Sequence, residues 1–173
     1  MPFFYPTLYR RRITDVTSDD LRRLGVRGIL LDVDNTLTTH DNPNLTTEVR
    51  EWLDNMQAKG FFLLIVSNNV EERVAPFAEK IGLPFCAHAR KPLPYGYRKA
   101  AASLGLPKKE CVAIGDQIFT DILGANLSGI PSVMLEPIEP EVEQKFIVFK
   151  RKVERLLMKN RHQRRRREND YGR

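Results

Sequence analysis

The stretch Gly28-Ile-Leu-Leu-Asp-Val-Asp-Asn-Thr-Leu37 decides the fold class. It begins as an apolar run, which is typical of a β-strand buried on both faces of a sheet. Asp32 and Asp34 follow, and residues two apart on an extended chain point to the same side. Two adjacent carboxylates repel each other unless a cation lies between them. Acids, then Asn and Thr, at the carboxyl end of a buried strand indicate a hard metal ion and a phosphate group. The alternative is a loop in which the acids only cap a turn.

Strand-like and helical segments alternate along most of the chain. Strands are predicted over 28–34, 61–66, 84–87, 111–114 and 132–135, and helices over 18–24, 46–59, 71–81, 95–104 and 121–127. Glycines follow several of these helices, at the position where a left-handed residue commonly ends a helix. Strict alternation predicts an α/β fold: a three-layer, Rossmann-like core with a mostly parallel five-stranded sheet.

Polar side chains follow four successive predicted strands. Asp32 and Asp34 follow the first strand, and Ser67 with Asn68 follows the second. The other candidates come later in the chain, namely Lys91, Asp116 and Asp121. Ligands of parallel α/β sheets bind beyond the carboxyl ends of the strands, so the sequence predicts one site at that edge.

These segments resemble the haloacid dehalogenase-like (HAD) phosphohydrolase superfamily. Its four motifs appear in order: Asp-x-Asp-x-Thr from Asp32, a Ser at position 67, a Lys at position 91, and an acidic pair in Gly115-Asp-Gln-Ile-Phe-Thr-Asp121. The sequence around Ser67 and Lys91 is similar to that of the YqeG family of class IIIA. This family is itself similar to mitochondrial phosphatidylglycerophosphate phosphatases. The resemblance covers about residues 28–135. The two connections where relatives insert a cap domain are too short for one here.

The resemblance implies catalysis by two acids. Asp32 is expected to be the nucleophile and to form an aspartyl-phosphate. Asp34 is expected to protonate the leaving alkoxide and then to activate the water that hydrolyses the intermediate.

The resemblance also implies a Mg²⁺ ion and a set of phosphate contacts. Asp32, Asp116 and the backbone carbonyl of Asp34 are expected to hold the metal, with Asp121 supporting them. The expected phosphate-binding residues are Ser67, Asn68 and Lys91, and Thr36 is a weaker candidate for a phosphate or loop contact.

Composition and charge limit the possible domain organisation of the chain. The length of 173 residues and a hydrophobic content of 42% fit one domain with a true core. The net charge is +6, of which +4 comes from residues 161–173. We therefore expect a single domain over 1–160, ending in an amphipathic helix from about Glu141, and a basic, disordered tail over 161–173. Cys86 and Cys111 are expected to be buried, reduced thiols.

The N-terminal segment and the predicted C-terminal helix have a composition that suits contact with a membrane surface. Phe3, Phe4 and Tyr5 precede Arg10-Arg11-Arg12, and the predicted C-terminal helix carries basic residues beside an apolar stripe. Both segments suit either an anionic membrane or packing within the protein. With no signal peptide or membrane-spanning run, we expect a cytoplasmic protein in peripheral contact with the inner face of the membrane.

The leading hypothesis is a Mg²⁺-dependent phosphatase acting on phosphatidylglycerophosphate, in the synthesis of phosphatidylglycerol and cardiolipin. One alternative is a phosphatase for a soluble or macromolecular phosphate ester. Another is an RNA- or ribosome-binding protein that uses its basic tail, although the chain has no aromatic-rich strand motif for stacking bases. Deleting residues 161–173 would abolish binding only in that last case. The sequence leaves the oligomeric state open.

Overall fold

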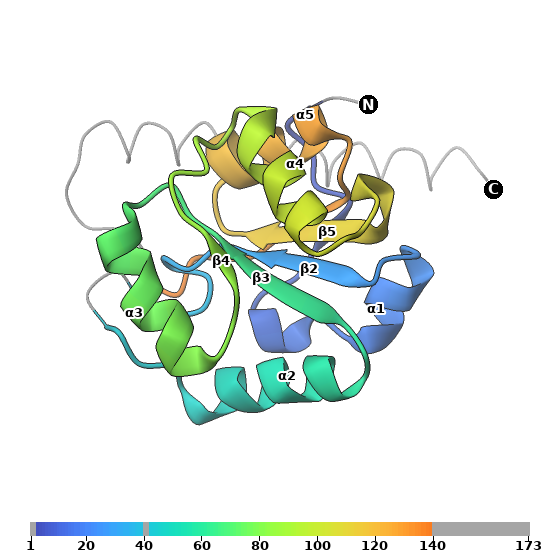
Figure 1. Ribbon diagram of the computed structural model, residues 1–173. Helices are drawn as coiled ribbons and strands as arrows, with labels where there is room; N and C mark the ends of the chain where they lie inside the picture. The colour runs from blue at the N-terminus through green and yellow to red at the C-terminus, as the bar shows by residue number, and fades with distance from the viewer. Residues whose placement is uncertain (1–2, 40–41, 140–173) are drawn as a thin grey trace. The chain divides into compact units, whose positions relative to one another are not determined.

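The computed structural model describes residues 3–39 and 42–139, and the residues up to Ile138 form one structural unit (Figure 1). In chain order its elements are β1 (Leu8–Tyr9), η1 (Ile13–Asp15), α1 (Ser18–Arg23), β2 (Gly28–Leu31), α2 (Thr47–Ala58), β3 (Phe62–Val66), α3 (Glu71–Ile81), β4 (Phe85–Cys86), α4 (Pro94–Ser103), η2 (Lys108–Glu110), β5 (Cys111–Gly115), η3 (Ile118–Ile122), α5 (Leu123–Ser128) and β6 (Ser132–Met134). The predicted alternation of strands and helices is confirmed.

The strands form one sheet in the order β1-β6-β5-β2-β3-β4, and every pairing in it is parallel. The predicted α/β class is therefore confirmed, with β2 in the middle between β5 and β3. The sheet has six strands where five were predicted. The extra strand, β1, pairs Leu8 with Val133 and Tyr9 with Met134. Two residues are too few to show an apolar or alternating pattern, so no pattern of residues indicates this edge strand.

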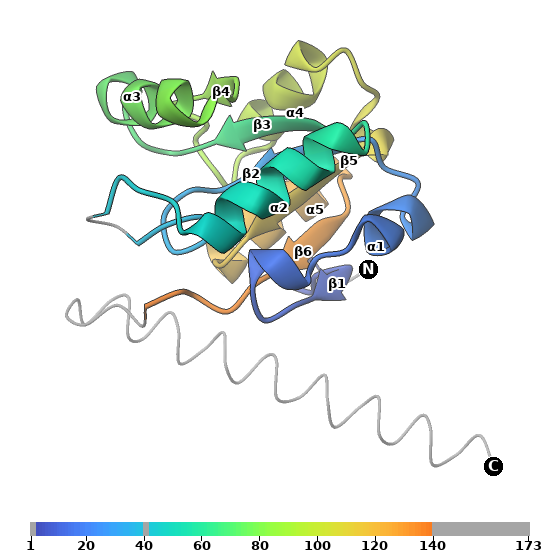
Figure 2. The ribbon, with the colours of Figure 1, turned by 90° about the horizontal axis from the view of Figure 1, so that it is seen from below.

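Helices cover both faces of the sheet because side chains alternate along each strand. Ile29 and Leu31 of β2 pack with apolar residues of α1, α2 and α3, whereas Leu30 packs with those of α4 and α5. Figure 2 shows α2 lying across the first of these faces. On that side the indole of Trp52 is buried and donates a hydrogen bond to the carbonyl oxygen of Val16 at 2.8 Å.

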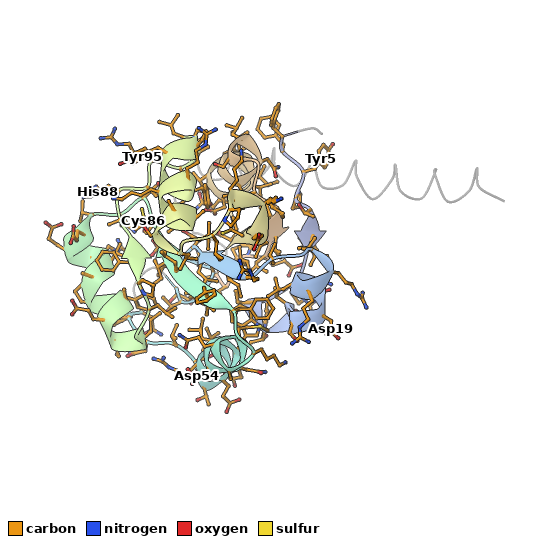
Figure 3. All side chains as sticks on the ribbon, turned by 45° about the vertical axis from the view of Figure 1, so that its right-hand side comes forward. Tyr5, Asp19, Asp54, Cys86, His88 and Tyr95 are labelled. Atoms are coloured by element: carbon orange, nitrogen blue, oxygen red, sulfur yellow. The ribbon has the colours of Figure 1, made fainter. Side chains whose placement is uncertain are left out.

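The helix ends follow the predicted signals. The hydroxyls of Thr17 and Thr46 accept backbone N–H groups at the starts of α1 and α2. Gly82 ends α3 in the left-handed conformation. The helix predicted over 121–127 begins earlier, since a π-helical turn (η3) precedes α5. Cys86 and Cys111 are buried free thiols, as expected (Figure 3 labels Cys86).

The connections around the site are short. Among the described residues, the link from β2 to β3 contains α2 as its only helix, and the link from β3 to β4 contains α3, so neither holds a cap domain. No helix within the described ranges is long and apolar enough to cross a membrane. The helix predicted from about Glu141 and the basic tail over 161–173 lie outside the described residues.

Candidate active site

Three aspartates meet at the carboxyl edge of the two central strands. Asp32 follows β2, Asp116 follows β5, and Asp121 lies in η3. One carboxylate oxygen of each lies within 4.8 Å of the others. Asp116 and Asp121 are fully buried and Asp32 nearly so. The sequence predicted that these aspartates meet at the ends of separate strands, with Asp121 in a supporting role.

Gly115 allows this approach. A Cβ atom at Gly115 would lie 2.4 Å from the side-chain carboxyl carbon of Asp121, which is closer than any real contact. The Asp121 carboxylate is held by the backbone N–H of Gln117 at 3.1 Å and by the hydroxyl of Tyr97 at 3.3 Å. Only glycine at the end of β5 leaves room for this carboxylate, which explains the Gly-Asp pair in the sequence.

Lys91 supplies a positive charge to the cluster. Its ammonium lies 2.5 Å from an oxygen of Asp32 and 2.6 Å from an oxygen of Asp121. Burial alone opposes its charged form, but Asp121 and Asp32 hold the pKa of Lys91 well above its usual value. Burial raises the pKa of Asp32, with Lys91 opposing the shift and Asp121 adding to it. Burial and then the charge of Asp121 raise the pKa of Tyr97 well above its usual value.

The loop that carries Lys91 is fixed by Asn68. The Asn68 side chain accepts the backbone N–H of Lys91 at 2.6 Å and donates to the carbonyl oxygen of Lys91 at 3.0 Å. His88 and Arg90 in this loop adopt positive φ angles, of 48° and 54°. Asn68 was predicted to bind phosphate, and in this structure its side chain contacts the Lys91 backbone and so holds the position of the lysine.

The chain leaves the sheet earlier than predicted. The strand predicted over 28–34 ends at Leu31, because a tight loop follows it. In that loop the carbonyl oxygen of Val33 accepts the N–H of Leu37 at 3.0 Å, and Asn35 has a φ of 60°. Asn tolerates this left-handed conformation better than most residues do.

Asp34 consequently has different partners from Asp32. It accepts a hydrogen bond from the Asn69 amide at 2.8 Å and forms an ion pair with Arg73 at 3.2 Å. Asn69 and Arg73 were missed by the sequence analysis. The only signal for Asn69 was its place next to Ser67 and Asn68, and Arg73 looks like an ordinary surface residue of α3.

Two hydroxyls complete the predicted set. Ser67 is buried after β3, and its oxygen accepts the backbone N–H of Asn69 at 3.1 Å. Thr36 is buried, and its hydroxyl has no hydrogen-bond partner among the described residues. A buried hydroxyl without a partner is uncommon in folded proteins and suits a site that receives a ligand.

Three buried carboxylates beside one ammonium leave an excess of negative charge. Oxygen ligands of this kind fit a hard divalent cation, and a cation would relieve their repulsion. The residues present therefore fit the metal site that the sequence predicted.

An aspartate cluster with a buried lysine, at the carboxyl edge of a parallel α/β sheet, is typical of hydrolases that act on phosphate esters. The haloacid dehalogenase-like hydrolase family model matches residues 40–129, more than half of the chain. The chain is 40% identical over 157 residues to the probable phosphatase YqeG of Bacillus subtilis, and the match covers 90% of each protein. The chain belongs to the haloacid dehalogenase-like hydrolase family and is a phosphatase of that family, as its motifs predicted.

Other similarities are more distant. The chain is 25% identical over 167 residues to phosphatidylglycerophosphate phosphatase 1 of Arabidopsis thaliana. That match covers 91% of this chain and 48% of the plant protein. A HAD phosphatase from Thermococcus onnurineus shares the fold with a TM-score of 0.52 and 15% identity, over 69% of this chain and 90% of that one.

Proposed function

We propose that the protein is a Mg²⁺-dependent phosphomonoester phosphatase whose substrate is phosphatidylglycerophosphate. The observation that carries the catalytic part is the cluster of Asp32, Asp116 and Asp121 with Lys91 between two of its carboxylates. The substrate is proposed from the similarity to the plant phosphatase named for this lipid.

In the proposed mechanism Asp32 attacks the phosphorus atom of the ester, and the bond from phosphorus to the alcohol oxygen breaks. Asp34 gives its proton to the departing alkoxide. Water then attacks the phosphorus of the aspartyl-phosphate while Asp34 takes up a proton, which releases phosphate and restores Asp32. The separate partners of the two acids support separate roles, since Asp34 contacts Asn69 and Arg73 rather than Lys91.

Asp32, Asp116 and the backbone carbonyl of Asp34 are proposed to hold Mg²⁺, with Asp121 supporting them. When bound, the ion supplies positive charge that offsets the repulsion between two anionic reactants and orients their oxygens. The buried, all-oxygen donor set supports this assignment.

Lys91 and Ser67 are proposed to bind the transferring phosphoryl group, Lys91 as a point charge. Asn68 is proposed to contact the same phosphoryl group and also to hold Lys91 in place, since its amide contacts the lysine backbone. The buried Thr36 hydroxyl is proposed as a further phosphate or loop contact.

The test is phosphate release from phosphatidylglycerophosphate in mixed micelles, with and without Mg²⁺, for the wild type and Asp32→Asn. Turnover that requires Mg²⁺ and disappears in the variant is the expected result. Hydrolysis of an aryl phosphate alone, still dependent on Asp32, would overturn the lipid substrate and keep the phosphatase. No hydrolysis of either ester would overturn the whole proposal.

We also propose that the protein acts in peripheral contact with the anionic, cytoplasmic face of a membrane. The N-terminal segment supports this. Phe4 packs edge to face against Phe119 with 5.7 Å between ring centroids, while Phe3 stays 53% exposed. The Arg11 side chain is also exposed. Cosedimentation with phosphatidylglycerol vesicles should weaken in Phe3→Ser; equal sedimentation of both proteins would contradict a role for this segment.

A further inference from the structure

A cavity of about 230 Å³ opens beside Asp34. Its walls come from the loop after β2, the end of β3 and the first two turns of α3, which lie next to each other (Figure 1). Ser67 and Asp34 line it, so it adjoins both the proposed phosphoryl-binding residue and the proposed general acid. A phosphoryl group held between Asp32 and Ser67 would direct its leaving alcohol into this space.

The walls of the cavity are mixed in character. The apolar part of the lining consists of Val33, Pro43, Val74 and Phe77. The threonine and asparagine side chains of the lining are Thr38, Thr39, Asn42 and Asn69. Such a lining suits an alcohol that has both carbon and hydroxyl groups, and its described residues form no enclosed apolar slot for an acyl chain.

Among the residues that the structure describes, Arg73 is the one cationic residue that lines the cavity. Its guanidinium lies 3.2 Å from Asp34, and its side chain is 42% exposed. A guanidinium has five N–H donors in a planar fork, so it can contact a carboxylate and a second anion together. The acidic residues of the first turn of α3, Glu71 and Glu72, are exposed and do not line the cavity.

We propose that this cavity binds the leaving alcohol and that Arg73 selects phosphomonoesters whose alcohol carries a second anionic group, such as a phosphodiester. This inference rests on the proposed phosphatase function. A phosphodiester occurs both in a lipid headgroup and in its soluble, deacylated form. The arginine recognises the same charge in each, so the two sources are separated by experiment.

The competing role for Arg73 is to position Asp34 only. The two roles differ in substrate dependence. An arginine that only positions the general acid affects every ester equally, whereas an arginine that binds the alcohol affects only esters with the second anion.

The first measurement compares kcat/KM for deacylated phosphatidylglycerophosphate with that for glycerol 3-phosphate, whose leaving alcohol is neutral. The variants are Arg73→Gln, Arg73→Lys and, as a matched loss of charge on exposed α1, Arg22→Gln. We expect Arg73→Gln to lose about 30-fold on the diester-bearing substrate, as for one charge-assisted hydrogen bond, and less than about threefold on glycerol 3-phosphate. Arg73→Lys should retain part of the preference, and Arg22→Gln all of it. Equal losses on both substrates would overturn the proposal.

The second measurement is independent of turnover. Glycerophosphoglycerol, a phosphodiester without a monoester, is titrated into each protein, and the amide NMR shifts of Val74 and Phe77 are followed. We expect the wild type and Arg22→Gln to bind this diester with similar affinity. Arg73→Gln should bind it at least about tenfold more weakly. Absence of wild-type binding, or equal binding by Arg73→Gln, would overturn the proposal. Arg73-dependent binding without phosphate release from any ester would refute the phosphatase function and leave the cavity assignment standing.

A third comparison identifies the source of the diester. Faster turnover of micellar phosphatidylglycerophosphate than of its deacylated form assigns the lipid headgroup. Faster turnover of the deacylated form assigns a soluble diester. The loss in Arg73→Gln should appear with both substrates, and its absence from both would overturn the role of Arg73.

Discussion

Asp32 and Asp34 are two residues apart, yet their surroundings differ. The Asp32 side chain is 11% exposed and pairs with Lys91, which is 3% exposed. The Asp34 side chain is 23% exposed and pairs with Arg73, which is 42% exposed. Each acid thus pairs with a cationic residue of the described part of the chain, but only the first pair is withdrawn from water.

This difference separates the two sides of the site physically. Charges in a buried cluster interact strongly and tolerate little movement, whereas water and salt weaken a pair near the surface. The buried side is suited to hold a metal and a phosphoryl group in one geometry. The exposed side can exchange its contacts, which suits the proposed role of Asp34 as a general acid for alcohols that leave into the cavity.

The largest expected effect tests the division between the two acids. Asp32→Asn removes the proposed nucleophile and should lower phosphate release from an aryl phosphate by roughly 10⁴-fold or more. Asp34→Asn should lose on the order of 10²- to 10³-fold, because a good leaving group needs less help from an acid. Asp54→Asn is the control, since Asp54 is exposed on the side of α2 away from the sheet (Figure 3). A larger loss in Asp34→Asn than in Asp32→Asn would contradict the assignment.

The next effect concerns stability. Lys91→Met leaves Asp32 and Asp121 without their shared cation, and loss of one partner of a buried ion pair costs about 3–5 kcal/mol. Arg73→Met breaks the exposed pair and should cost about 1 kcal/mol or less. Urea unfolding in EDTA measures both, and added Mg²⁺ should restore part of the loss in Lys91→Met. Similar losses for the two variants would show that the pairs do not differ as their burial implies.

A smaller effect separates carboxylate from backbone ligands of the metal. Mg²⁺ at 100 times its dissociation constant should stabilise the wild type by about 2.7 kcal/mol, because it binds the folded state. Asp116→Asn should lose most of this gain. Asp34→Asn should keep it, since only the backbone carbonyl of Asp34 is proposed to contact the ion. Thermal unfolding with and without Mg²⁺ provides the measurement, and loss of the gain in Asp34→Asn would move its carboxylate onto the metal.

The sequence predicted the sheet and its edge well because both depend on strong local signals. The apolar runs around Leu30 and Leu64 have the length and composition of buried strands, and the glycines mark helix ends. Ligand residues at successive strand ends then meet through the parallel topology alone. The edge strand β1 escaped prediction because two residues paired through their backbones carry no pattern.

The contacts of individual side chains could not be predicted in the same way. Asn68 and Asn69 are chemically identical neighbours, but one contacts the Lys91 backbone and the other contacts Asp34. Which contact each makes depends on the φ and ψ angles of the loop after β3. The residue types alone do not predict these angles. Arg73 was missed for a similar reason, since its role depends on which turn of α3 meets the loop after β2.

The smallest effect uses these neighbouring asparagines to sharpen the comparison. Asn69→Ala removes a hydrogen bond to the partly exposed Asp34 carboxylate, and we expect kcat to fall by about tenfold with stability nearly unchanged. Asn68→Ala removes two hydrogen bonds to the backbone that carries the buried lysine, and we expect a stability loss of about 1–3 kcal/mol along with weaker phosphate binding. Steady-state kinetics and urea unfolding on the same preparations measure the pair, with the exposed Asn55→Ala as control. The reverse pattern, a stability loss in Asn69→Ala and a pure kcat effect in Asn68→Ala, would contradict the separation of a fixed phosphoryl side from an exchangeable leaving-group side.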